Sequence, residues 1–227
     1  MATLLADPSV TAVIFDVDGT LVDTNYLHAV AWGEAMRQHG HPVPMWVVHR
    51  AVGMGSDRLL DAVLPADRDR SADDAIRAAH GTLYATWWGR LNPVPGAAAL
   101  LRACAGRGLR VVLSSSAQAA ELAAMRAALD ADDAVAGATS SGDVEQSKPA
   151  PDLVRAALDL AGSLPQDTVF VGDTVWDARA CAQLEVPFIG VLTGGISLRE
   201  LVDAGAQEIY RDPAELLERL NASDGAR

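Results

Sequence analysis

The chain has 227 residues, of which 50% are hydrophobic and 21% are charged, which is the composition of a globular protein with a substantial core. Its formal net charge is −12, from 18 Lys and Arg against 30 Asp and Glu, and this excludes nucleic acid and anionic membranes as general partners. The chain has no uncharged apolar stretch of about 18 residues and no signal-peptide pattern at its N-terminus, so we expect a cytoplasmic protein.

Six short apolar runs, each closed by turn-forming or polar residues, predict the strands. The first reads A-V-I-F-D-V and stops at an Asp-Gly-Thr turn. The predicted strands lie at residues 12–17, 109–114, 134–139, 168–172, 187–192 and 207–210. Between them, apolar residues three and four apart predict helices at 97–107, 117–129, 151–161, 177–184 and 213–220. This alternation predicts an α/β fold with a Rossmann-like, three-layer core, in which helices cover both faces of a parallel sheet.

Residues 22–92 interrupt this alternation, because they contain no convincing strand. Their apolar pattern predicts helices at 24–39, 44–50, 56–64 and 72–91. A segment of this length is too long for one crossover helix, so we predict an inserted α-helical domain. The predicted division is an α/β core domain of residues 1–21 and 94–227 and a helical domain of residues 22–93.

The stretch V-I-F-D-V-D-G-T places two carboxylates, Asp16 and Asp18, at the end of the first strand. Along an extended chain both point to one side, roughly 6–7 Å apart, where each opposes the ionisation of the other unless a cation lies nearby. Mg²⁺ accepts oxygen ligands and leaves positions open for a phosphate. One Asp could then attack phosphorus while the other transfers protons. Taken alone, the stretch is equally typical of a strand followed by an ordinary Asp-Gly turn.

A second acidic group follows the predicted strand at 168–172, with Asp173 directly after V-F-V-G and Asp177 four residues later. Parallel strands open their carboxyl ends on one edge of the sheet, so these acids should approach the first pair. Three or four carboxylates without a matching cluster of basic residues favour a metal site over a structural network.

Lys148 is the only Lys in the chain, and it lies in S-K-P-A-P-D, where two prolines restrict the loop. A fixed ammonium beside several carboxylates would orient a nucleophile and attract a phosphate, whereas the ordinary alternative is a solvated surface Lys. The strand at 109–114 runs into Ser114, Ser115 and Ser116. Their hydroxyls either bind phosphate or only close the strand and cap a helix.

Four segments in this order resemble the haloacid dehalogenase-like hydrolase superfamily: V-I-F-D-V-D-G-T-L-V-D-T, V-V-L-S-S-S, S-K-P-A-P-D and V-F-V-G-D-T-V-W-D-A. The resemblance runs from residue 13 to about residue 195, and the inserted helices are similar to the cap of the phosphoglycolate phosphatase and β-phosphoglucomutase-like subgroup. It implies a Mg²⁺-dependent phosphatase. The implied substrate is a small phosphorylated metabolite, phosphoglycolate-like or sugar-phosphate-like, hydrolysed through an aspartyl-phosphate intermediate.

The resemblance implies a role for each acid of the predicted site. Asp16 matches the nucleophile, and Asp18 matches the general acid and base, whose backbone carbonyl also binds Mg²⁺. Asp173 matches a metal ligand, and Asp177 matches the acid that supports it directly or through water. The implied metal site therefore comprises Asp16, Asp18, Asp173 and Asp177.

The other motifs are implied to bind the phosphoryl group or the substrate. Ser115 best matches the hydroxyl that holds the phosphoryl group, with Ser114 and Ser116 as alternatives, and Lys148 matches the stabilising Lys. The predicted binding residues are Ser115, Ser116, Lys148, Gly19, Thr20, His28 and Arg50. The implied cap also offers Trp32, on the same helix face as His28, and the loop at 52–57; packing within the cap is the alternative for both aromatic residues.

Three other functions compete with the hydrolysis of a phosphate ester. A β-phosphoglucomutase-like phosphotransferase would carry an Arg in the cap loop where this chain has Ser56, and dehalogenase relatives lack the second acid, Asp18. A non-catalytic phospho-accepting regulatory module would use similar acids, a hydroxyl and a Lys, but the D-x-D-G-T turn and the insertion fit it poorly. We expect a monomer or a homodimer.

Overall fold

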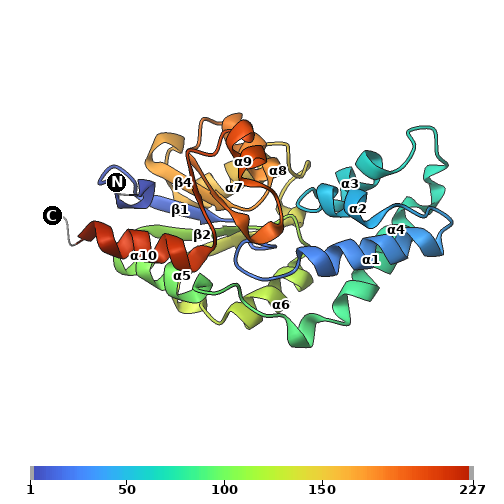
Figure 1. The fold of residues 1–227 in the computed structure, drawn as a ribbon, viewed down its shortest axis with the longest axis horizontal. Helices are drawn as coiled ribbons and strands as arrows, with labels where there is room; N and C mark the ends of the chain where they lie inside the picture. The colour runs from blue at the N-terminus through green and yellow to red at the C-terminus, as the bar shows by residue number, and fades with distance from the viewer. Residues whose placement is uncertain (1–2, 225–227) are drawn as a thin grey trace.

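The computed structural model of the protein describes residues 3–224, and within them six parallel strands form one sheet in the order β3-β2-β1-β4-β5-β6 (Figure 1). The strands are β1 (Ala12–Phe15), β2 (Arg110–Ser114), β3 (Gly137–Thr139), β4 (Thr168–Gly172), β5 (Phe188–Val191) and β6 (Glu208–Tyr210). All residues of β1, β4 and β5 are buried, because helices cover both faces of the sheet. The predicted α/β fold is confirmed.

Two groups of helices form the outer layers. The helices α5 (Ala97–Gly106), α6 (Ala119–Leu129) and α10 (Pro213–Asp224) pack on the face to which Val13 and Phe15 point. The helices α7 (Asp152–Ala161), α8 (Val175–Ala182) and α9 (Leu198–Ala204) pack on the opposite face, around Ile14 and Phe170. Figure 1 shows these groups on opposite sides of the sheet. Because side chains alternate along a strand, β1, β2, β4 and β5 each contribute residues to both hydrophobic clusters.

The sequence patterns misplaced two elements and missed a third. The predicted strand at 134–139 begins only at Gly137, because β3 is an edge strand that pairs with β2 over three residues, and the preceding turn is a 3-10 helix (Asp132–Ala134). The predicted helix at 72–91 ends at Ala85 and is followed by a 3-10 turn (Trp88–Arg90). Helix α9 was not predicted, although Ser197 and Glu200 form a capping box at its start.

The helices between β1 and α5 form a hydrophobic cluster of their own. They are α1 (Asn25–Gln38), α2 (Met45–Ala51), α3 (Ser56–Val63) and α4 (Asp73–Ala85). This helical segment lies to one end of the sheet, on the right in Figure 1. Its buried side chains include Trp32, Met36, Leu60 and Ile76. The chain enters and leaves it beside a bridge between Val22 and Pro93, and the division into domains at 22–93 stays a prediction. Within residues 3–224, no helix is long and apolar enough to cross a membrane.

Gly96 and Gly108 form a matched pair for testing how the chain returns to the core. Both have a φ of +82°, which L side chains rarely adopt. A Cβ at Gly96 would lie 2.5 Å from Cα of Ala214 in α10, whereas a Cβ at Gly108 would meet nothing within 4 Å. We expect Gly108→Ala to lower the free energy of unfolding by about 1 kcal/mol, and Gly96→Ala to lower it by clearly more, because a backbone must move. Urea unfolding measures both values, and equal losses would contradict the packing described.

His80 in α4 should make the stability of the helical segment depend on pH. The side chain is 7% exposed, and its ring stacks on Trp32 with 3.9 Å between centroids. Burial, and then the neighbouring His28, hold the pKa of His80 well below its usual value of 6.5. The unfolded chain therefore takes up this proton at a higher pH than the folded protein does. The free energy of unfolding should fall as the pH drops through about 6.5, by at most about 1.4 kcal/mol per pH unit.

When the pH is lowered from about 7.5 to about 5.5, the free energy of unfolding should fall by about 1 kcal/mol less in His80→Gln than in the wild type, because Gln does not titrate. Urea unfolding at the two pH values gives the comparison. The matched control is His41→Gln, in the loop between α1 and α2, which should keep the wild-type difference. An unchanged pH dependence in His80→Gln would show that His80 is not held neutral.

Candidate active site

Three buried acids meet at the carboxyl ends of β1 and β4. They are Asp16 after β1, Asp173 after β4 and Asp177 in the first turn of α8, and one oxygen of each lies within 4.8 Å of the others. The backbone N–H of Asp16 donates to the carbonyl oxygen of Val171 at 2.9 Å, which continues the sheet into the site. Asp177 is held by Thr174, whose hydroxyl donates to Oδ2 at 2.6 Å. The predicted convergence of the two acidic segments is present.

Polar side chains next to Asp16 hold the acids in place. The hydroxyl of Thr20 lies 3.1 Å from Asp16 Oδ2 and 2.9 Å from Asp173 Oδ1, so it can donate to either one. Asn25 Nδ2 donates to Asp173 Oδ2 at 2.7 Å. The turn that follows Asp18 needs Gly19, because its φ is +73° and a Cβ there would collide with the amide of Asn25. Asn25 was not predicted, since no spacing in the sequence indicates where its side chain points.

Lys148 supplies one positive charge to this acidic cluster. Its Nζ lies 2.5 Å from Asp16 Oδ1 and 2.8 Å from Asp177 Oδ1, and the side chain is 1% exposed. Burial opposes the charge of Lys148, but the two carboxylates outweigh it and raise the pKa of the ammonium. The alternative of a solvated surface Lys is therefore wrong.

The cluster as a whole holds more negative than positive charge. Burial raises the pKa of Asp16 to about 7, against the opposing effect of Lys148. Burial, together with the charges of Asp16 and Asp177, raises the pKa of Asp173 well above its usual value. A divalent cation would relieve this cost, and Mg²⁺ prefers a set of carboxylate oxygens such as this one. The side chains present therefore fit the predicted metal.

Asp18 has a different environment from Asp16. Its Oδ1 accepts hydrogen bonds from the hydroxyl of Thr24 at 2.8 Å and from Nε2 of His28 at 3.0 Å, and its Oδ2 accepts from the hydroxyl of Ser115 at 3.1 Å. Burial opposes ionisation, but these hydrogen bonds prevail and lower the pKa of Asp18. Two neighbouring acids thus have pKa values shifted in opposite directions, which is typical of acids with different chemical roles.

The three serines after β2 also differ. Ser115 is buried, donates to Asp18 and accepts from the backbone N–H of Ala117 at 3.0 Å. Ser116 lines the cavity described below, and its buried hydroxyl has no partner among residues 3–224. The hydroxyl of Ser114 is buried and unpartnered in the same part of the chain, while its carbonyl oxygen lies 3.4 Å from Lys148 Nζ. Ser116 is therefore as well placed as Ser115 to meet a ligand.

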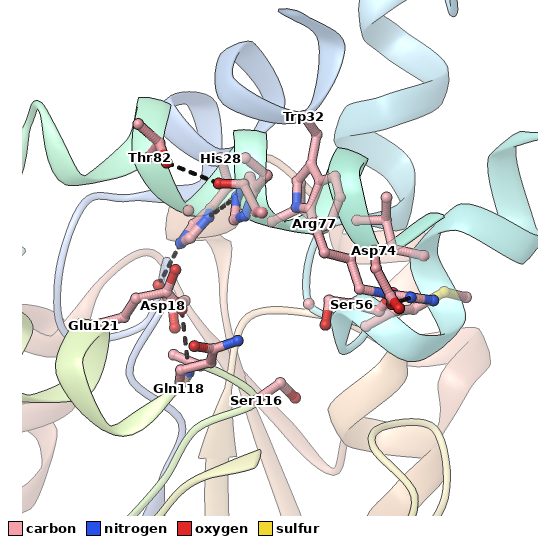
Figure 2. Close-up of a pocket in the computed structure, with 18 of the residues that line it drawn as sticks. Asp18, His28, Trp32, Ser56, Asp74, Arg77, Thr82, Ser116, Gln118 and Glu121 are labelled. Carbon is pink, nitrogen blue, oxygen red and sulfur yellow. Dashed lines mark hydrogen bonds and ion pairs between the residues drawn. The ribbon is translucent and has the colours of Figure 1, made fainter. Parts of the chain in front are cut away.

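A cavity of about 500 Å³ lies between the sheet edge and the helical segment (Figure 2). Asp16, Asp18 and Ser116 line its core side, where the acidic cluster opens. Trp32 and His28 of α1 line its helical side. The predicted His28 thus lies at the cavity and bonds to Asp18, and its Nδ1 is 3.1 Å from Nε2 of His80.

One predicted binding residue lies elsewhere. The guanidinium of Arg50 in α2 pairs with Glu200 in α9, and Arg50 is not among the residues that line the cavity. We therefore withdraw Arg50 as a phosphate ligand. Arg77 in α4 does line the cavity and was not predicted, because a charged residue on a helix is usually solvated and only the packing of α4 shows which way it faces.

Comparisons with known proteins agree with this geometry. A family model described as haloacid dehalogenase-like hydrolase matches residues 10–184. The phosphoglycolate phosphatase of Rhodospirillum rubrum is 29% identical in an alignment of 214 positions that covers 90% of this chain and 88% of the relative. That of Escherichia coli strain K12 is 27% identical in an alignment of 237 positions that covers 93% of this chain and 92% of the relative. A solved hydrolase from Pseudomonas syringae is 30% identical with a TM-score of 0.88, covering 94% of this chain and 98% of that one. The chain therefore belongs to the haloacid dehalogenase-like hydrolases.

Proposed function

We propose that the protein is a Mg²⁺-dependent phosphatase that hydrolyses a small phosphorylated metabolite. The observation that carries this proposal is the buried contact of Lys148 with Asp16 and Asp177, beside Asp173, together with the position of Asp16 at the wall of a cavity. Phosphoryl transfer needs a positioned nucleophile and positive charge around the transferred group, and this cluster can supply both. The similarity to phosphoglycolate phosphatases over most of the chain supports the same activity.

Asp16 is the proposed nucleophile. Its carboxylate lines the cavity, and its contact with Lys148 favours the ionised form that can attack. In the first step a carboxylate oxygen bonds to phosphorus while the bond from phosphorus to the ester oxygen breaks, which leaves an aspartyl-phosphate and releases the alcohol. In the second step water attacks the same phosphorus, which frees inorganic phosphate and restores the carboxylate of Asp16.

Asp18 is the proposed general acid and base. In its protonated form it gives a proton to the departing ester oxygen, and in its ionised form it then takes a proton from the attacking water. The hydrogen bonds from His28 and Thr24 hold the side chain in one orientation and favour the ionised form. The negative charge of a bound phosphate would shift the balance toward the protonated form that the first step needs.

The remaining residues bind the metal and the phosphoryl group. Asp16, Asp173 and the backbone carbonyl of Asp18 would hold Mg²⁺, with Asp177 in support. The metal would offset the charge that develops on the phosphoryl oxygens. Lys148 and the hydroxyls of Ser115 or Ser116 would hold the same group, and Gly19 and Thr20 would keep the turn in place around it.

Ser56 favours this reading over a phosphomutase. It begins α3 and lines the cavity on the helical side, at the position where the mutase-like relatives were expected to carry an Arg. A non-catalytic regulatory module conflicts with membership of a hydrolase family that covers residues 10–184.

The variant Asp16→Asn should lose at least about 1,000-fold in kcat toward p-nitrophenyl phosphate in the presence of Mg²⁺, because the amide cannot attack phosphorus. The matched control is Asp23→Asn, an exposed acid a few residues away, which should keep the wild-type rate. Comparable rates in Asp16→Asn and the wild type would refute the proposed nucleophile.

Removal of the metal should abolish activity reversibly. Treatment with EDTA should stop hydrolysis of p-nitrophenyl phosphate, and added Mg²⁺ should restore it, because the surplus negative charge of the cluster then lacks its counter-ion. The variant Asp173→Asn should need about 10–100-fold more Mg²⁺ for half-maximal activity. Activity that persists in EDTA, or an unchanged Mg²⁺ requirement in Asp173→Asn, would contradict this metal site.

A further inference from the structure

The walls of the cavity are unfavourable for a second negative charge. Four carboxylates line it: Asp16, Asp18, Asp74 and Glu121. Within residues 3–224, Arg77 is the only Arg or Lys among the lining side chains. Lys148 and a bound metal would be occupied by the phosphoryl group, so an additional anionic group of a substrate would have to rely on Arg77.

Arg77 already has its own partners. Its Nη1 pairs with Asp74 Oδ1 at 2.8 Å, its Nη2 lies 4.0 Å from Asp73 Oδ2, and its Nε donates to the carbonyl oxygen of Ser56 at 3.1 Å. Asp74 is highly exposed, so its pairing with Arg77 is weak in energy. It nevertheless places a like charge where a substrate carboxylate or second phosphate would have to approach, and this lowers the attraction of Arg77 for such a group.

The part of the cavity next to Asp18 offers hydrogen-bonding groups suited to hydroxyls. In Figure 2, Glu121 and Gln118 lie beside Asp18, the residue proposed to protonate the leaving oxygen. Glu121 Oε2 accepts from the backbone N–H of Gln118 at 3.1 Å, and no group within residues 3–224 donates to Oε1. Glu121 is half-buried, and burial raises the pKa of its carboxyl group, so a hydrogen bond donated by the substrate would favour the ionised form. A hydroxyl group can supply that donor, whereas an ionised carboxylate cannot.

The rest of the cavity is large and partly apolar. Trp32, Val52, Met54 and Leu59 contribute apolar surface, and the volume of about 500 Å³ lies within the range of pockets that hold ligands of appreciable size, about 300–1,000 Å³. A two-carbon acid would leave most of this space to water. A ring or chain that carries both C–H surface and hydroxyls would contact the apolar wall and the polar groups together.

We infer that the site selects phosphate monoesters of uncharged, hydroxyl-bearing alcohols, that is, sugar or polyol monophosphates, over phosphorylated carboxylic acids and bisphosphates. This inference rests on the proposed function. The reaction is the same hydrolysis: water replaces the alcohol on phosphorus, and the alcohol oxygen leaves with a proton. The specificity would come from the side chains that line the cavity around Asp18, and Glu121 is the one that chiefly recognises the alcohol.

The first experiment compares kcat/KM of the Mg²⁺-loaded protein for glucose 6-phosphate and sorbitol 6-phosphate with the values for phosphoglycolate and fructose 1,6-bisphosphate. We expect at least one of the first two to exceed both of the others by about tenfold or more, which corresponds to about 1.4 kcal/mol of transition-state binding. A higher value for phosphoglycolate or for the bisphosphate would overturn the inference and leave the phosphatase proposal standing. No hydrolysis of these esters or of p-nitrophenyl phosphate would overturn both.

The second experiment uses Glu121→Gln, which keeps an acceptor for the N–H of Gln118 and removes the negative charge. We expect kcat/KM to fall about tenfold for the favoured sugar or polyol phosphate and to stay level or rise for phosphoglycolate, because a repulsive charge is gone. The exposed Glu218 of α10 gives the control Glu218→Gln, which should change neither value. Equal decreases in kcat/KM for both substrates in Glu121→Gln would show that Glu121 supports the fold and does not recognise the alcohol.

Discussion

The contact of the Lys148 ammonium with Asp16 and Asp177 is the interaction on which the rest of the site depends. All three groups are almost fully buried, and a buried charge without a partner is costly. One ammonium cannot neutralise three neighbouring carboxylates, so the cluster still favours positive charge after Lys148 is in place. That shortage would favour the proposed divalent cation at the carboxyl edge of the sheet and, through the cation and Lys148, the proposed phosphoryl group. Folding and the proposed chemistry therefore use the same charges.

The helical segment completes the site from the other side. His28 connects the helical segment to Asp18 of the core, because its Nε2–H donates to the carboxylate of Asp18. Its Nδ1 can then accept a hydrogen bond from Nε2–H of His80. Further contacts attach the segment to the core. Among them, His49 Nε2 donates to the carbonyl oxygen of Gly194 at 3.0 Å, and Asp57 pairs with Ser147, the neighbour of Lys148. A change in the position of these helices would thus reach Asp18 and Lys148 as well as the cavity wall. Substrate recognition and the proposed proton transfer therefore depend on the same contacts between the helical segment and the core.

The sequence predicted the central strands and the acids at their ends because both leave strong local patterns. A strand buried on both faces is an unbroken apolar run, and the topology of a parallel sheet brings Asp16 and Asp173 to one edge. The residues that were missed or misplaced depend on tertiary packing. Asn25 reaches Asp173 only because the chain turns at Gly19, and Arg77 rather than Arg50 faces the cavity because of how α2 and α4 pack. No spacing along the chain encodes either fact.

The most direct measurement is to locate the phosphoryl group on the enzyme during turnover. The variant Asp18→Asn, which should slow the attack of water, can be mixed with a phosphate monoester and Mg²⁺, quenched in acid and digested, and its peptides analysed by mass spectrometry. A phosphoryl group on Asp16, absent when Asp16→Asn is combined with Asp18→Asn, is the predicted result. A phosphoryl group on another residue, or none while phosphate is being released, would contradict an aspartyl-phosphate formed at Asp16.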